Sequence, residues 1–336
     1  MRALNRALLA RQLLLERSEA ALPAALEQIA GIQAQYAPAM YVGAWTRRAG
    51  FERDSLTRAL EQRTVIEATL MRSTIHLVSA ADYWPFAVAT RQARRESWMR
   101  AVRGPTPSQM AGAARKLRRR LADGPMHRKD IEELLGKEVA RGVGLWVDLV
   151  RVPPSGTWEH RRADLYAAAE DWIPPVKVTP PQAIDHLVRS YLRGFGPASR
   201  GDVASFTGLR PGDLGPALKR IDPVRHRGAD GGELLDVPGA ALPDPDTPAR
   251  VRFLPVWDAT LLVHARRTGI LPEDLRPRVF HVKNPHGTPT FLVDGAVAGA
   301  WRYEDGHVTL DPWVKLSRAT RRALDDEAES LAAFHA

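Results

Sequence analysis

Two glutamines separated by one residue, Gln33-Ala34-Gln35, are the most unusual polar feature of the chain. Apolar residues recur at helical spacing over residues 22–29, which predicts a helix whose buried stripe continues to Gln33. Gln35 lies about 200° further round an ideal helix, so the two amides converge only if the helix stops there, and Pro38 allows that stop. A side-chain amide offers hydrogen bonds and a dipole but is no strong base, so this pair could orient another group without moving a proton.

A structural alternative exists for the same pair, in which both amides satisfy backbone groups of a loop. The local sequence leaves both interpretations open. No other familiar catalytic motif is present: the chain lacks a P-loop, a dinucleotide-binding fingerprint, an HExxH zinc motif and a GxSxG elbow. It also has no cysteine, which excludes disulfides, thiolate nucleophiles and cysteine-ligated metals. We therefore expect neither a cofactor nor a metal.

The charge of the chain favours a phosphate-rich partner. Its 336 residues include 48 basic and 39 acidic side chains, with a formal net charge of +9. Nearly all the basic residues are arginine, which codon bias could also explain. Basic runs at residues 91–103 and 115–120 could neutralise phosphates or form solvated helix faces. No segment is typical of a membrane span or a secretory leader, so we expect a cytoplasmic, nucleoid-associated protein.

Further candidate site residues lie near the glutamines or among the aromatic residues. His76 occupies an apolar strand predicted over residues 74–78, where it could be a hydrogen-bonded core residue or could line a pocket. Arg72 precedes it, and Tyr36 follows the second glutamine. Trp158 could stack on a base or belong to the core. Each of these four is a candidate pocket or DNA contact.

One pattern of helices followed by a hairpin recurs three times. In the third copy, helices are predicted over residues 183–193, 200–206 and 211–221, and short strands flank a glycine turn in VRHRG-ADGG-ELLDV. The second copy has helices over residues 107–121, 128–135 and 137–148, with strands at 149–152 and 162–167. The first has helices over 4–16, 23–32 and 55–62, with strands at 65–71 and 74–78. This arrangement is typical of winged helices.

After residue 250 the pattern changes to strands, predicted in RFLPVWD, LLVHA, TFLVDGAVAGAWRY and HVTLDPW, with hairpin turns at Asp294-Gly295 and Asp305-Gly306. A helix over residues 317–334 follows. We therefore predict an α+β fold, mainly helical. Three tandem winged-helix domains (1–100, 105–175 and 182–240) would precede a small β-rich domain with a closing helix (250–336).

Six stretches carry a resemblance that runs nearly end to end: GIQAQYAPAMYVGAWTR, TLMRSTIHLVSAADYW, LVRVPPSGTWEHRRADLY, YLRGFGPASRGDVASFTGL, RFLPVWDATLLVHARR and FLVDGAVAGAWR. Together they resemble the AlkZ and YcaQ family of winged-helix DNA glycosylases. Gln33-Ala34-Gln35 matches the Gln-apolar-Gln motif of the AlkZ branch. Members often have a basic residue in place of Glu67 and a glycine in place of Ser73, so a phosphate contact and a turn near the first wing are expected to differ.

The resemblance implies a monofunctional DNA glycosylase that hydrolyses the N-glycosidic bond of bulky N7-alkylated purines, including interstrand crosslinks. Such bases are already cationic and leave with little acid catalysis, so Gln33 and Gln35 need only position water and stabilise an oxocarbenium ion. The implied partner is double-stranded DNA, bound by a monomer without an obligate protein partner. Two alternatives remain: a non-catalytic winged-helix DNA-binding protein or regulator, and a protein that sequesters a genotoxin.

Overall fold

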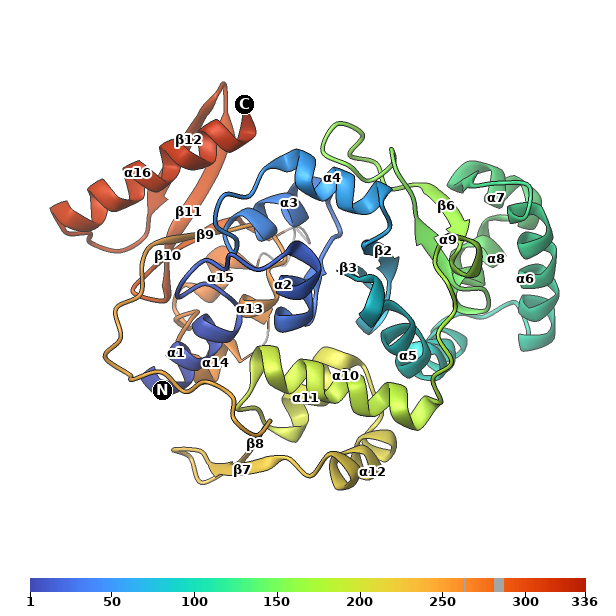
Figure 1. Ribbon diagram of the computed structural model, residues 1–336, viewed down its shortest axis with the longest axis horizontal. Helices are drawn as coiled ribbons and strands as arrows, with labels where there is room; N and C mark the ends of the chain where they lie inside the picture. The colour runs from blue at the N-terminus through green and yellow to red at the C-terminus, as the bar shows by residue number, and fades with distance from the viewer. Residues whose placement is uncertain (263, 281–286) are drawn as a thin grey trace.

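Helices and small antiparallel sheets alternate along the chain, which confirms the predicted α+β class. The structure is a computed structural model that describes residues 1–262, 264–280 and 287–336 (Figure 1). Within these ranges, every helix is too short or too polar to cross a bilayer.

Residues 1–101 contain the elements that hold the glutamine pair. They are α1 (Arg2–Arg11), α2 (Leu22–Ile29), β1 (Ile32–Gln33), α3 (Ala37–Trp45), α4 (Arg53–Glu61), β2 (Val65–Thr69), the 3-10 turn η1 (Met71–Ser73), β3 (Ile75–Ser79) and α5 (Ala80–Ala101). Two of these helices, α3 and α5, were not predicted as elements. Pro38 does not keep Ala37 out of a helix: it occupies the first turn of α3, where proline is tolerated because its missing N–H has no partner to lose.

The position of Gln33 corrects the prediction from helical spacing. α2 ends at Ile29 because Ala30 is left-handed (φ 60°) and Gly31 follows with φ 84°. Gln33 consequently lies in strand β1, not on the buried stripe of α2. The apolar periodicity continued beyond the helix because a strand that enters the core is also apolar.

Residues 107–172 form the second group of elements. They are α6 (Pro107–Leu121), β4 (Met126–His127), α7 (Arg128–Leu135), α8 (Lys137–Gly142), η2 (Val143–Leu145), β5 (Leu149–Arg151), β6 (Leu165–Ala168) and α9 (Ala169–Trp172). The helices predicted over 107–121 and 128–135 are confirmed. The third predicted helix is shorter than expected, since α8 gives way to a 3-10 turn after Gly142.

Residues 180–236 match their predicted elements most closely. They form α10 (Pro180–Phe195), α11 (Arg200–Thr207), α12 (Pro211–Ile221), β7 (Val224–Arg227) and β8 (Glu233–Asp236). Capping boxes at Thr179 and Ser199 start α10 and α11, and Gly208 ends α11 in a left-handed conformation (φ 73°). The three helices and the hairpin are thereby confirmed, and the assignment of a winged helix to them stays a prediction.

The C-terminal part contains one wrong prediction among several confirmed ones. Its elements are β9 (Arg252–Leu254), α13 (Ala259–Leu262), α14 (Ala265–Thr268), α15 (Arg276–Val279), β10 (Thr290–Val293), β11 (Ala296–Glu304), β12 (His307–Pro312) and α16 (Arg318–His335). The strand predicted for LLVHA is absent, because residues 261–262 belong to α13 and 265 begins α14, while residue 263 lies outside the described residues. Both Asp-Gly turns join antiparallel strands with positive φ at each residue, as predicted.

A six-stranded sheet with the order β1-β3-β2-β5-β6-β4 positions the glutamine pair. Its register places Gln33 opposite His76, His76 opposite Ala68, and Ala68 opposite Val150. Directly opposed residues project to the same face, so these four side chains share one side of the sheet. The sheet runs from the first predicted domain into the second, and the four domain boundaries remain a proposal.

Separate cores cover the two faces of this sheet. One contains Ala68 and Val150 and extends into α10, which packs against α5, α12 and α2. The other contains Ile32 and Leu77 and extends to β11 and α16. In Figure 1, α6 to α8 lie on the opposite side of the molecule from β12 and α16, with α10 crossing between them.

Candidate active site

The Gln33-Ala34-Gln35 segment lies along strand β3 and is fixed by it at each residue. Gln33 pairs with His76 in the sheet, and the Ala34 backbone N–H donates to the Ile75 carbonyl at 2.8 Å. The Ile75 backbone N–H in turn donates to Oε1 of Gln35 at 2.6 Å. Gln35 therefore satisfies a backbone group, as the structural alternative proposed, and its side chain is nonetheless exposed.

Gly31 brings the segment this close to β3. A Cβ atom at Gly31 would lie 2.9 Å from both the Leu77 carbonyl oxygen and Cγ1 of Val78, closer than real side chains approach. The residue also has φ 84°, a conformation that favours glycine. A side chain at position 31 would thus push the glutamine segment away from the strand that holds it.

Gln33 is almost buried, and Arg72 holds it. The side chain of Gln33 is 8% exposed, and its Oε1 accepts a hydrogen bond from Nη2 of Arg72 at 3.1 Å. Nη1 of Arg72 donates to the Phe206 carbonyl at the end of α11, and the guanidinium lies over the Phe206 ring at 4.9 Å. Burial lowers the pKa of Arg72 from its ordinary value. Arg72 therefore links the glutamine segment to α11.

His76 is a buried histidine beside this pair. It is 2% exposed, and its Nδ1 lies 3.0 Å from the Thr74 carbonyl. Burial, reinforced by the charge of Arg72, lowers its pKa to about 3, so the ring is neutral at physiological pH. The structure therefore agrees with the core-residue interpretation of His76, in which the ring cannot supply a proton as an imidazolium acid.

Tyr36 and Trp158 meet at a second location, next to Gln35 along the chain. Both line a cavity of about 220 Å³ that Arg161 and His335 also border. Tyr36 is 43% exposed, and its hydroxyl accepts a hydrogen bond from Nη1 of Arg161 at 3.3 Å. Trp158 is only 6% exposed, so it offers the cavity a small part of its ring.

The sequence did not predict the buried ion pair of Arg47 and Asp258, which lies near Gln33. Arg47 donates two hydrogen bonds of 2.9 Å to the two carboxylate oxygens of Asp258, and the residues are 3% and 6% exposed. Both residues border a very small cavity with Gln33 and Pro255. Asp258 lies in one of the stretches that carry the family resemblance, but no local pattern indicates Arg47 as its partner.

Glu67, where a phosphate contact was expected to differ, is a buried carboxylate. It is 2% exposed and projects from the other face of the sheet than Gln33 does. Its Oε1 lies 3.9 Å from Nε of Arg151. Gly156 covers it so closely that a Cβ there would lie 2.5 Å from Oε2. Burial raises the pKa of Glu67 to about 7, against the lowering effect of Arg151. The expectation for Ser73 is met, since its φ of 61° lies in the region that glycine prefers.

Glu67→Gln is expected to stabilise the protein at pH 8 and to have little effect at pH 4. The unfolded carboxyl releases its proton near pH 4.5 and the folded one near 7, so wild-type stability falls as pH rises between these values. The full penalty above pH 7 is roughly 3 kcal/mol, and glutamine removes it. Urea unfolding of both proteins across this range measures the difference, with exposed Glu61→Gln as the control. An equal stability change at both pH values would contradict the assignment.

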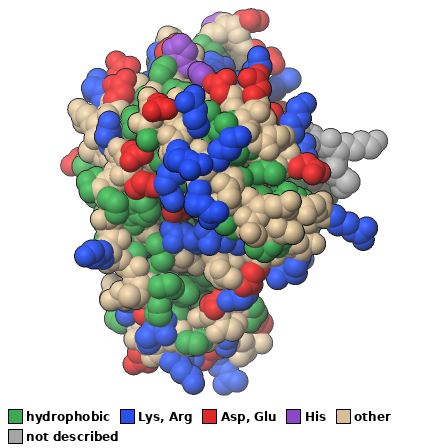
Figure 2. Space-filling view, turned by 90° about the vertical axis from the view of Figure 1, so that its right-hand side faces the viewer, with side chains coloured by type: hydrophobic (Ala, Val, Ile, Leu, Met, Phe, Trp, Pro, Cys, Tyr) green, Lys and Arg blue, Asp and Glu red, His purple; other side chains and the backbone are tan. Residues whose placement is uncertain are grey.

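The basic runs serve two different purposes. In α5, Arg91 pairs with Asp148 at 2.7 Å, and Arg94 and Arg95 donate to backbone carbonyls, so this run mostly connects protein elements. The basic side chains of α6 are exposed: Arg115, Lys116, Arg118, Arg119 and Arg120. Figure 2 looks onto the side where α6 to α8 lie and shows Lys and Arg gathered near its centre, with Asp and Glu around them. This face could meet phosphates.

No cluster of three or more His, Asp or Glu that could hold a metal occurs in residues 1–262, 264–280 and 287–336. The described site therefore consists of amide, guanidinium, imidazole and aromatic side chains. Such a set can hold water, orient dipoles and contact phosphates.

Comparison with known proteins gives the family. A sequence model of the DNA glycosylase AlkZ-like family matches residues 26–334. An interstrand DNA cross-link repair glycosylase from Streptomyces sahachiroi is 22% identical over 355 residues, covering 96% of this chain and 93% of that protein. The structure of the Streptomyces sahachiroi DNA glycosylase AlkZ is similar in fold, with a TM-score of 0.82 at 18% identity, covering 99% of this chain and 96% of that one. Because the family match spans nearly the whole sequence, the chain belongs to the AlkZ-like DNA glycosylase family.

Proposed function

We propose that this glycosylase hydrolyses the N-glycosidic bond of bulky N7-alkylated purines in double-stranded DNA, including interstrand crosslinks. The observation that carries the proposal is the Gln33-Ala34-Gln35 segment, which β3 holds in a fixed position with Gln35 exposed. The Streptomyces relative is a cross-link repair glycosylase, which supports the substrate class. The role is repair of alkylated DNA or protection of the cell from a genotoxin.

The side chains present suit this reaction because the substrate is already activated. Alkylation at N7 makes the purine cationic, so the base leaves as a neutral molecule and needs little proton donation. His76, with a pKa of about 3, could not donate that proton at neutral pH. What remains is to place a water molecule beside C1′ and to stabilise the positive charge that develops on the sugar. Fixed amide carbonyls perform both tasks.

We assign the water to Gln35 and support of the deoxyribose to Gln33. Each amide oxygen has two lone pairs, and one is already occupied: by the Ile75 N–H in Gln35 and by Arg72 in Gln33. The existing hydrogen bonds fix the direction of the second lone pair before substrate arrives. This preorganisation is the property that makes a dipole catalytic. The cavity beside Tyr36 and Trp158 would accept part of the adduct or of the DNA backbone.

Purified protein is expected to release the base from a duplex that carries one N7-alkylguanine, with EDTA present. Since no acid or base titrates in the proposed mechanism, the rate of base release should vary modestly between pH 6 and 8. Chromatography of the released base measures the reaction, and an undamaged duplex is the control. Binding to duplex without release from N7-methyl, mustard-crosslinked or natural-product-adducted guanine would contradict the proposal.

A further inference from the structure

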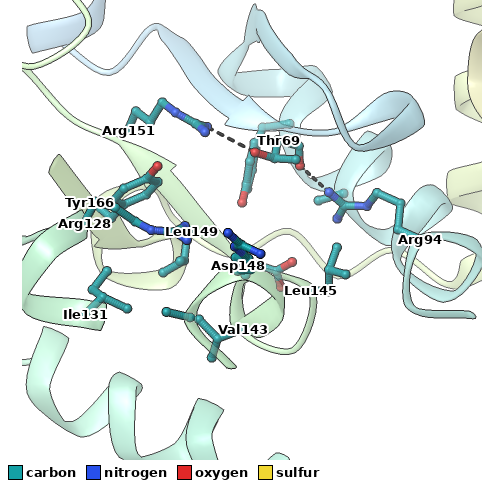
Figure 3. Close-up of a pocket in the computed structure, with 15 residues that line it drawn as sticks. Thr69, Arg94, Arg128, Ile131, Val143, Leu145, Asp148, Leu149, Arg151 and Tyr166 are labelled. Carbon is teal, nitrogen blue, oxygen red and sulfur yellow. Dashed lines mark hydrogen bonds between the residues drawn. The ribbon is translucent and has the colours of Figure 1, made fainter. Parts of the chain in front are cut away.

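An arginine-lined cavity lies away from the glutamine segment, between the end of β2 and the α7 to β6 region. Its volume is about 100 Å³. Figure 3 shows Thr69 on one side of the cavity, with the guanidinium groups of Arg94 and Arg151 reaching Thr69 from either side. Arg128 and Arg141 also line it. Four cationic side chains from two parts of the chain therefore surround one small space.

Arg94 and Arg151 are buried without using all their donors. They are 6% and 8% exposed. Arg94 donates to the Thr69 carbonyl through Nη1, and Nη1 of Arg151 donates to Oγ1 of Thr69 at 3.2 Å. The Nε–H of each has no hydrogen-bond partner among the described residues. A buried donor without a partner costs free energy, and the cost is larger when the group is charged.

Nearby carboxylates only partly balance the charge. Asp148 is the one acidic residue among those described as lining the cavity, and it already pairs with Arg91 at 2.7 Å. Arg128 pairs with Glu132 at 2.7 Å. Glu67 approaches Arg151 to 3.9 Å only, and burial raises its pKa to about 7, so it is partly protonated at neutral pH. The cavity therefore keeps an excess of positive charge.

We propose that this cavity binds a single phosphate group, with the guanidinium groups of Arg94, Arg128 and Arg151 as donors. Guanidinium forks match the oxygens of a tetrahedral oxyanion and are weakly hydrated, so they suit a partly buried anion site. One water molecule needs roughly 10–15 Å³ of cavity space, so a cavity of about 100 Å³ has room for a group larger than water. The group comes either from free phosphate or from a DNA phosphodiester.

Phosphate bound at this site would stabilise the position of β3, the strand that holds the glutamines. Thr69 pairs with Ile75 in the β2–β3 register, and the Ile75 N–H holds Gln35. A phosphate bound across Arg94 and Arg151 would fix Thr69 and thereby the end of β3. Binding itself does not depend on glycosylase activity, so it can be tested on protein that has not met damaged DNA.

The test is a titration of the full chain with inorganic phosphate, followed by ³¹P NMR and thermal unfolding at constant ionic strength. We expect saturable binding to wild type, at least tenfold weaker in Arg151→Gln and in Arg128→Gln. Arg128 is half-buried on a helix, so its variant tests the site even if Arg151→Gln fails to fold. Exposed Arg322→Gln on α16 removes the same charge outside the cavity and should bind phosphate like wild type.

The same titration identifies the source of the phosphate. Displacement of bound phosphate by an undamaged duplex assigns the site to a DNA phosphodiester, and retention assigns it to the free anion. The proposal is overturned if phosphate raises the unfolding temperature of wild type no more than another salt does at the same ionic strength. Equal weakening of phosphate binding in Arg322→Gln and in the cavity variants would overturn it as well.

Discussion

Gln35→Ala is expected to slow base release from an N7-alkylguanine duplex by about 10²-fold or more. The substitution removes the exposed amide that we assign to the attacking water. The Ile75 N–H that donated to this amide can donate to a water molecule in its place. Folding should be little affected, because the side chain lies at the surface. Single-turnover rates with enzyme in excess measure the loss without a contribution from product release.

Gln33→Ala belongs to the same experiment and separates two roles. It should slow base release comparably, and it should also reduce stability, because Arg72 loses a hydrogen-bond acceptor in a partly buried place. The matched control is Gln62→Ala, an exposed glutamine at the end of α4. Wild-type rates in folded Gln35→Ala and Gln33→Ala proteins would remove the glutamine segment from the mechanism while leaving the family assignment intact.

Asp258→Asn is expected to lower the free energy of unfolding by about 3–5 kcal/mol. Arg47 would keep its charge in a buried place with a neutral partner, and an unpaired buried charge is among the most destabilising changes known in proteins. Although burial alone would raise the pKa of Asp258, Arg47 and Thr260 together lower it, so the carboxylate stays ionised at neutral pH. Urea unfolding at pH 7 gives the difference.

Asp54→Asn is the matched control for this substitution. Asp54 has an 84% exposed side chain and reaches Arg58 only at 4.0 Å, so its loss should cost less than about 0.5 kcal/mol. A loss below about 1 kcal/mol in Asp258→Asn would mean that Arg47 finds another partner or water. Because Arg47 and Asp258 line one small cavity with Gln33, a destabilised pair should also reduce base release.

Local signals account for the elements that the sequence predicted well. Capping residues at Thr179 and Ser199, the glycine at 208 and the Asp-Gly turns each act within a few residues of the chain, so their effects can be read from sequence. The LLVHA run failed for the opposite reason. A run of four apolar residues and one histidine fits a strand or a buried helix equally well, and the tertiary context placed residues 261–262 in α13 and 265 in α14.

The sequence indicated the motif of the site, but it did not indicate how the residues around the motif contact one another. The resemblance indicated Gln33 and Gln35, and their catalytic assignment stays a prediction. The helical spacing placed Gln33 wrongly, because the left-handed Ala30 and Gly31 end the helix first. The Arg47–Asp258 pair joins residues 211 positions apart, and no periodicity or local motif reports a contact at that separation.

The shared six-stranded sheet limits how enzymes of this kind can be recombined. The strand β2 pairs with β3 on one edge and with β5 on the other, so residues 1–100 alone would present an open β2 edge to other chains. A chimera that exchanges only this segment would have to rebuild a sheet from two parents. The first suitable junction between two parents lies after α9, in residues 174–179, because β2 and both strands that pair with it then come from the same parent.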